Sequence, residues 1–197
     1  MGNYKTVYQS AQVEIIIEKS RFIGYVLPIQ KEEDAINFIA TIKKKHWDAT
    51  HNVPVYVLGD QFSVQRYSDD GEPSGTAGVP ILEMLKKEEI TNVCVVVTRY
   101  FGGVKLGTGG LVRAYTQAAK DALEMAILVE KKLFFCYRIK VSYTSHGKLQ
   151  NYFQNDDTVI TGQTLFTDLV DMQVYFEPEH EKHILEQITE MTSGDRK

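Results

Sequence analysis

The chain has 197 residues and a formal net charge of -4, with 43% hydrophobic and 24% charged residues. These proportions are ordinary for a soluble globular protein, so a packed core is expected and disorder is not. Proteins that coat nucleic acid non-specifically usually carry a basic excess, because release of counterions from phosphates drives that binding. The acidic balance argues against that class and favours a discrete site.

The cellular compartment and the absence of membrane contact are predicted from the cysteine content and from the lack of long apolar runs. Cys94 and Cys136 lie in apolar runs and are predicted to be buried thiols. Two cysteines supply neither a disulfide framework nor a four-cysteine zinc site. The first ten residues hold no apolar signal core, and no apolar run approaches the roughly 18 residues of a membrane span. A cytoplasmic protein without membrane contact is expected.

The first third of the chain predicts strands around one helix. Residues 12–29 are rich in Ile, Val, Phe and Tyr and predict one bent strand or two strands. Residues 31–46 have helical apolar spacing, with acids in the first turn and lysines in the last, as the helix dipole favours. Residues 51–58 and 62–67 predict two strands joined at Gly59–Asp60.

The middle of the chain alternates loops with strongly apolar elements. Residues 68–78 form a polar, glycine-rich loop, and residues 79–87 predict a short helix. Residues 91–100 are the most apolar run and predict a central buried strand. A second loop, 101–107, precedes a helix that opens at Thr108 and carries an apolar stripe.

The remaining sequence predicts a second, smaller domain beyond a boundary near residues 129–132. Its order is βαββα, the start of a ferredoxin-like split βαβ unit, which requires one more strand. The chain stops before that strand, so we expect the strand to be missing or the chain to be shortened. The expected elements are strand 133–143, helix 145–155, strands 158–166 and 169–176, and helix 179–191.

Two glycine-rich segments bracket the most apolar strand and form the candidate site. Glycines let backbone amides approach a ligand, and those that open a helix leave free N–H groups for an anion. Basic side chains add charge, and aromatic ones stack on a base or pack beneath the loop. The segment is neither a P-loop nor a dinucleotide fingerprint, and turn and capping roles explain such glycines equally well. The candidate ligand or nucleic-acid residues are Arg99, Tyr100, Phe101, Gly102, Gly103, Lys105, Gly107, Thr108, Gly109, Gly110 and Arg113.

Three runs in this region closely resemble the signature of the IMPACT/YigZ family. They are SDDGEPSGTAG (68–78), VVVTRYFGG (95–103) and LGTGGLVRAY (106–115). Residues 19–52, with SRFIG and ATHN, also look like the family, and residues from about 133 resemble the C-terminal domain of its bacterial members. The chain is therefore identified as a member in the bacterial two-domain form. The expected domains are 1–130, with the signature region 68–128, and 133–197.

The resemblance implies an α+β fold and a link with translation. The first domain would be similar to the second domain of ribosomal protein S-five, and the second to the ferredoxin-like domains of elongation factor G. Eukaryotic relatives regulate translation through a separate N-terminal recognition domain, for which this chain has no room. Ribosome or RNA association is the part expected to transfer. Val79 departs from many bacterial relatives, which carry a basic residue there.

An acidic loop offers a second candidate site, made of Asp69, Asp70, Glu72 and Ser74. Carboxylates of this kind hold Mg²⁺, but adjacent acids beside Gly and Pro are more typical of turns. No metal and no cofactor are therefore expected.

Nucleophilic and metal chemistry based on serine or histidine has little support. Ser68 and Ser74 have no nucleophile-elbow context, and no Cys–His pair is suggested. The pairs His46/His51 and His180/His183 are predicted to be surface histidines rather than metal ligands.

Three functions stay open at this stage. The first is a non-enzymatic regulator that binds RNA, the ribosome or a translation factor, with no DNA partner. The second is a hydrolase-like enzyme that acts on a small phosphorylated or acidic ligand. The third is a regulator that acts through protein contacts alone. The oligomeric state is also open.

Overall fold

The middle strand of the first sheet, β6 (Val93–Tyr100), organises the first of two compact units. The units are Met1–Lys131 and Lys132–Lys197, in a computed structural model that describes residues 2–192. Seven of the eight β6 residues are buried, as expected for the most apolar run of the sequence. The sheet is antiparallel with the order β2-β3-β6-β4-β5. The other strands are β2 (Ala11–Ile17), β3 (Ser20–Pro28), β4 (His51–Leu58) and β5 (Val64–Tyr67).

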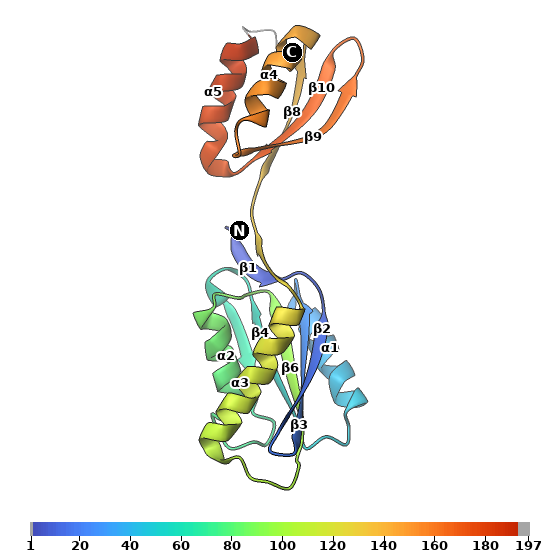
Figure 1. The fold of residues 1–197 in the computed structure, drawn as a ribbon, viewed down its shortest axis with the longest axis vertical. Helices are drawn as coiled ribbons and strands as arrows, with labels where there is room; N and C mark the ends of the chain where they lie inside the picture. Colours follow the sequence, from blue (N-terminus) through green and yellow to red (C-terminus); the bar gives the residue numbers. More distant parts are fainter. Residues whose placement is uncertain (1, 193–197) are drawn as a thin grey trace. The chain divides into compact units, whose positions relative to one another are not determined.

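Helices cover both faces of this sheet (Figure 1). Helix α1 (Glu32–Lys45) packs on the face that carries Cys94 and Val96 of β6. Helices α2 (Gly78–Lys87) and α3 (Gly107–Met125) pack on the opposite face. Because successive side chains of a strand point to opposite faces, β6 contributes to both cores. The α+β fold class predicted from the sequence is confirmed.

A glycine allows α3 to lie unusually close to the sheet. A Cβ atom on Gly24 of β3 would come within 2.3 Å of the Ala118 backbone oxygen. The facing side of α3 is lined by buried alanines at 114, 118, 119 and 122, whose small side chains permit this approach. The helix start is thereby fixed beside the end of β6.

Two short strands of the first unit escaped prediction. β1 (Tyr4–Val7) pairs antiparallel with β7 (Leu128–Lys131) in a separate two-stranded ribbon. Between β4 and β5, the predicted turn contains a 3₁₀ segment, Asp60–Phe62. The predicted region 12–29 is two strands, β2 and β3, whose turn residues Glu18 and Lys19 both have positive φ angles.

The second unit contains a three-stranded antiparallel sheet with two helices. The order β8-β10-β9 is that of the first three strands of a ferredoxin-like fold. Residues from both helices and all three strands form one core. The expectation about a missing last strand falls on residues outside the described range. The elements are β8 (Phe135–Val141), α4 (Tyr143–Gln154), β9 (Val159–Phe166), β10 (Val170–Phe176), a 3₁₀ turn (Pro178–His180) and α5 (Glu181–Thr192).

No helix within residues 2–192 has the length and apolar character needed to cross a membrane.

Candidate functional site

The last residues of β6 divide the predicted site between the two faces of the sheet. Arg99 lies on the face covered by α3 and contacts Glu72. Tyr100 lies on the α1 face, where its hydroxyl is 2.9 Å from His46 Nδ1 and donates to Asp48. The structure therefore does not bring Tyr100 together with Arg99.

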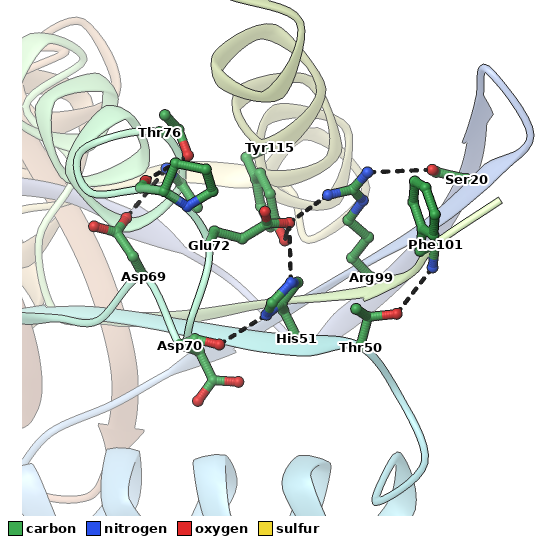
Figure 2. Close-up of polar contacts among 12 residues, drawn as sticks. Ser20, Thr50, His51, Asp69, Asp70, Glu72, Thr76, Arg99, Phe101 and Tyr115 are labelled. Atoms are coloured by element: carbon green, nitrogen blue, oxygen red, sulfur yellow. Dashed lines mark hydrogen bonds and ion pairs between the residues drawn. The ribbon is translucent and has the colours of Figure 1, made fainter. Parts of the chain in front are cut away.

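A buried ion pair forms the centre of the site (Figure 2). Arg99 Nη1 donates to Glu72 Oε1 at 2.6 Å, and the two side chains are 6% and 4% exposed. Tyr115 of α3 donates its hydroxyl to the same oxygen at 2.8 Å. His51 Nε2 lies 3.7 Å from it. Burial and the neighbouring Glu72 carboxylate raise the pKa of Tyr115, so this phenol stays a donor.

His51 has a fixed orientation within this cluster. Its Nδ1 lies 2.8 Å from the backbone oxygen of Asp70. A carbonyl only accepts, so Nδ1 carries a hydrogen, and Nε2 lies toward the Glu72 carboxylate. The backbone around Asp70 and Gly71 has positive φ values of 49° and 90°, which shapes the turn toward His51.

The other acids of the 68–78 loop organise its backbone. The Asp69 carboxylate accepts from the amides of Gly75, Ala77 and Gly78, and so caps the start of α2. The Asp70 carboxylate accepts from the Asn52 amide and from Lys43 Nζ. Within residues 2–192 no group of three or more His, Cys, Asp or Glu side chains is arranged to hold a metal ion. Ser74 is exposed.

Two segments distant in sequence, at Ser20 and Thr50, meet around Arg99. Its Nη2 lies 3.4 Å from Ser20 Oγ, which also accepts from the Gly102 amide. The Thr50 amide donates to the Arg99 backbone oxygen, and Thr50 Oγ1 accepts from the Phe101 amide. The Phe101 ring, 48% exposed, lies 5.5 Å from the Arg99 guanidinium carbon. Arg99 Nε is buried and has no hydrogen-bond partner in the described part of the chain.

A pocket of about 420 Å³ opens beside this cluster, between the end of β6 and the start of α3. Lys105 lies on its wall, and no side chain of the N-cap residue Leu106 satisfies the first α3 amides. The Arg99 and Glu72 charges cancel, so Lys105 and the helix dipole leave the pocket positive. The pocket is lined by Thr50, His51, Glu72, Pro73, Arg99, Phe101, Lys105, Leu106, Gly107, Thr108 and Leu111.

Arg113 belongs to a neighbouring hollow of about 590 Å³. Lys105 and Leu106 line both hollows, so a cation stands between them. The second hollow is lined by Ile17, Glu18, Val104, Lys105, Leu106, Gly110, Arg113, Ala114 and Gln117.

The candidate glycines have different structural roles. A Cβ on Gly102 would lie 2.0 Å from the Lys19 backbone, so close packing explains this glycine. Gly103 and Gly107 have φ values of +86° and +68°, which glycine adopts without strain. A Cβ on Gly109 would meet only Arg113 Nη1, at 3.7 Å, and a Cβ on Gly110 would meet the Leu106 side chain. Neither crowding nor a positive φ explains a glycine at 109.

Two predictions about single residues were wrong. His46 is buried, 7% exposed, because its ring lies between the hydroxyls of Tyr25 and Tyr100. Cys136 is exposed because β8 places it on the sheet face opposite the core. Cys94 is buried as predicted, and burial raises its pKa to about 12.

Ser20, Thr50, His51 and Tyr115 were missing from the predicted site. Tyr115 sits in the apolar stripe of α3, so its spacing indicated core and concealed its hydroxyl. Ser20, Thr50 and His51 lie in the SRFIG and ATHN runs that resemble the family, but nothing in those runs indicates a contact with Arg99 or Glu72. The sequence did indicate that Tyr100 lies apart from Arg99, because adjacent residues of a strand point to opposite faces of the sheet.

The fold and this site define a class of two-domain proteins. An α+β domain with two glycine-rich loops around its central strand is followed by a small βαββα domain. Residues 18–123 match the Impact N-terminal domain, and residues 139–195 match the Domain of unknown function (DUF1949). The chain belongs to the IMPACT family.

Relatives resemble the chain over most of its length. It is 43% identical to the IMPACT family member YvyE of Bacillus subtilis, over 98% of this chain and 89% of the relative. It is 38% identical to the IMPACT family member YigZ of Escherichia coli, over 64% and 63% of the two chains. A solved structure described as that of a hypothetical protein is 28% identical, with a TM-score of 0.63 and coverage of 100% and 96%.

Proposed function

We propose that this chain is a translation-linked regulatory protein that binds RNA or the ribosome without catalysing a reaction. The observation that carries the proposal is the positive pocket at the start of α3. The resemblance to the IMPACT/YigZ family supplies the link with translation, and the pocket supplies a contact that suits a phosphate.

The pocket chemistry supports an anionic ligand that also has an apolar part. Lys105 provides a full positive charge, and the first amides of α3 provide donors at the positive end of the helix dipole. Phe101 and Leu106 line the same pocket and offer apolar surface to a base or sugar. Phosphate beside a flat apolar group is the chemistry of a nucleotide.

Charge reversal at Lys105 tests this proposal. Full-length protein is sedimented with purified ribosomes at increasing salt, as wild type and as Lys105→Glu. The reversal is expected to weaken co-sedimentation and lower the log–log salt slope by about 1. Arg99 is a poor test residue, because its loss would leave Glu72 buried without its charged partner.

Lys120→Glu is the matched control. Lys120 lies on α3, roughly 20 Å from the start of the helix, and its side chain is 57% exposed. Equal loss of binding in both variants, or binding unaffected by either, contradicts the proposal. Association that survives nuclease treatment and resists salt would favour a regulator acting through protein contacts alone.

A hydrolase for a small phosphorylated ligand is the second candidate. The orientation of His51 favours it, since Nε2 faces Glu72 at the pocket wall while Nδ1 is held by the Asp70 carbonyl. Turnover of p-nitrophenyl phosphate that is abolished in His51→Gln, with folding retained, would favour this candidate over the first.

A further inference from the structure

Trp47, the single tryptophan of the chain, is 83% exposed. Tryptophan is usually highly buried, since its large ring gains much from leaving water. Trp47 lies two residues after Lys45, the last residue of α1, and residues 43–48 read KKKHWD. An aromatic ring held in water beside a run of cations calls for a physical explanation.

The exposure of Trp47 is not a consequence of a loose loop, because both neighbours are anchored. His46 is buried between the hydroxyls of Tyr25, at 2.6 Å, and Tyr100, at 2.9 Å. Asp48 accepts a hydrogen bond from the Tyr100 hydroxyl at 3.1 Å. The residues on either side of Trp47 are thus anchored, and the exposed indole projects from this anchored segment.

The surroundings of Trp47 are cationic and polar. Lys44, Lys45, Asp48 and Thr50 are exposed around it in sequence, and Asp48 is already engaged by Tyr100. Lys45 Nζ lies over the Tyr25 ring, and neither Lys44 nor Lys45 has an acidic partner among the described residues. A protein-docking patch would need contiguous apolar surface at its core, which this sequence neighbourhood does not provide.

This surface lies at the same edge of the sheet as the pocket. Thr50 lines the pocket and accepts from the Phe101 amide. Trp47 precedes Thr50 by three residues, so their Cα atoms are at most about 11 Å apart. Trp47 and Phe101 are therefore two exposed aromatic residues near the same end of β4 and β6.

We propose that Trp47, with Lys44 and Lys45, is a stacking platform for single-stranded RNA. The inference rests on the proposed function and names the form of RNA that the protein takes. An unpaired base stacks on the indole while the lysines contact the adjoining phosphates. Duplex RNA cannot do this, because its bases are already stacked within the helix.

Tryptophan fluorescence tests the platform directly, because only Trp47 emits as an indole. The full chain is titrated with an oligouridylate of about twelve nucleotides, and with a blunt duplex of the same length. The single strand is expected to quench the emission of Trp47, and the quenching is expected to weaken as the salt concentration rises. No quenching by the single strand, or equal quenching by the duplex, overturns the proposal.

Variants separate this inference from the proposed function. Binding of a fluorescently labelled oligouridylate is measured by anisotropy for Trp47→Ala, Ile36→Ala and Lys105→Glu. Ile36 is the control, an apolar residue of α1 that is 57% exposed. Trp47→Ala is expected to weaken binding about fivefold or more, and Ile36→Ala to have no effect.

If Lys105→Glu weakens binding and Trp47→Ala does not, the pocket stands and the platform is overturned. If the oligonucleotide does not bind at all while the wild type still co-sediments with ribosomes, the platform is overturned and the proposed function stands. A third outcome also overturns the RNA platform. If Trp47→Ala abolishes association with a nuclease-treated ribosomal protein fraction but leaves oligonucleotide binding intact, Trp47 makes a protein contact.

Discussion

Arg99 Nη1 and Glu72 Oε1 form a 2.6 Å hydrogen-bonded ion pair that joins the end of the central strand to the 68–78 loop. Both side chains are almost fully removed from solvent. Truncation of one member of such a pair leaves the other charge buried and uncompensated. Arg99 and Glu72 therefore have a structural role, and the proposed function assigns the ligand contacts to Lys105 and the start of α3.

The first prediction follows from this pair. Glu72→Ala is expected to lower the free energy of unfolding by about 3–5 kcal/mol, as measured by urea unfolding with circular dichroism. Glu83→Ala removes an exposed partner of Lys86 and should change stability by less than about 0.5 kcal/mol. Similar effects of the two changes would show that the buried pair is energetically unimportant.

The glycines of the signature give the second prediction. Gly102→Ala should destabilise strongly, because its Cβ would clash with the Lys19 backbone at 2.0 Å. Gly109→Ala should raise stability by about 0.5–1 kcal/mol, because alanine favours the helix and the position is open. Thermal melts of the two variants check the opposite signs. If Gly109→Ala folds normally but loses RNA binding, that glycine serves close approach of the ligand.

The capping role of Asp69 gives the third prediction. Asp69→Ala removes the acceptor for three amides at the start of α2 and should cost about 1–3 kcal/mol. The thermal midpoint should fall equally with and without EDTA. A midpoint of the wild type that drops on addition of EDTA would point to a metal in the acidic loop.

The pH dependence of stability gives the fourth prediction. Burial, with the charges of Lys45 and Arg21, lowers the pKa of His46. As pH falls below the ordinary value of about 6.5, the unfolded chain binds this proton first, so the folded state loses stability. The contribution is complete above that pH and is lost as pH falls toward the native pKa.

Unfolding free energies of wild type and His46→Gln at several pH values between neutrality and mild acid check this. The wild type should lose more stability toward acid than the variant. Parallel curves would indicate that His46 does not titrate differently in the two states.

The sequence predicted the elements with strong local patterns. β6 was predicted correctly because it is a continuous apolar run, and α1 and α3 because their apolar residues recur at helical spacing. β1 and β7 were missed, because each has four residues and its partner lies at the other end of the first unit. A short strand with a distant partner leaves no local periodicity to detect.

For the candidate site, the sequence placed Arg99, Lys105 and the start of α3 in one region, and these residues line one pocket. It did not separate Asp69, a cap, from Glu72, an ion-pair partner, because both are acids of one loop and the difference is tertiary. The burial of His46 likewise depends on Tyr25 and Tyr100, which lie on other elements.

The β1–β7 ribbon sets a condition on how the protein is made. β1 leaves the ribosome first, and its partner follows about 120 residues later, which at 5–20 residues per second is a delay of roughly 6 to 25 seconds. During that interval the antiparallel partner of Tyr4–Val7 does not yet exist, whereas the bridge from Lys5 to Ile90 requires only residues made earlier. The β1–β7 ribbon thus closes only after α3 has been synthesised, so a fusion placed before β1 acts on a nascent chain whose ribbon is still open.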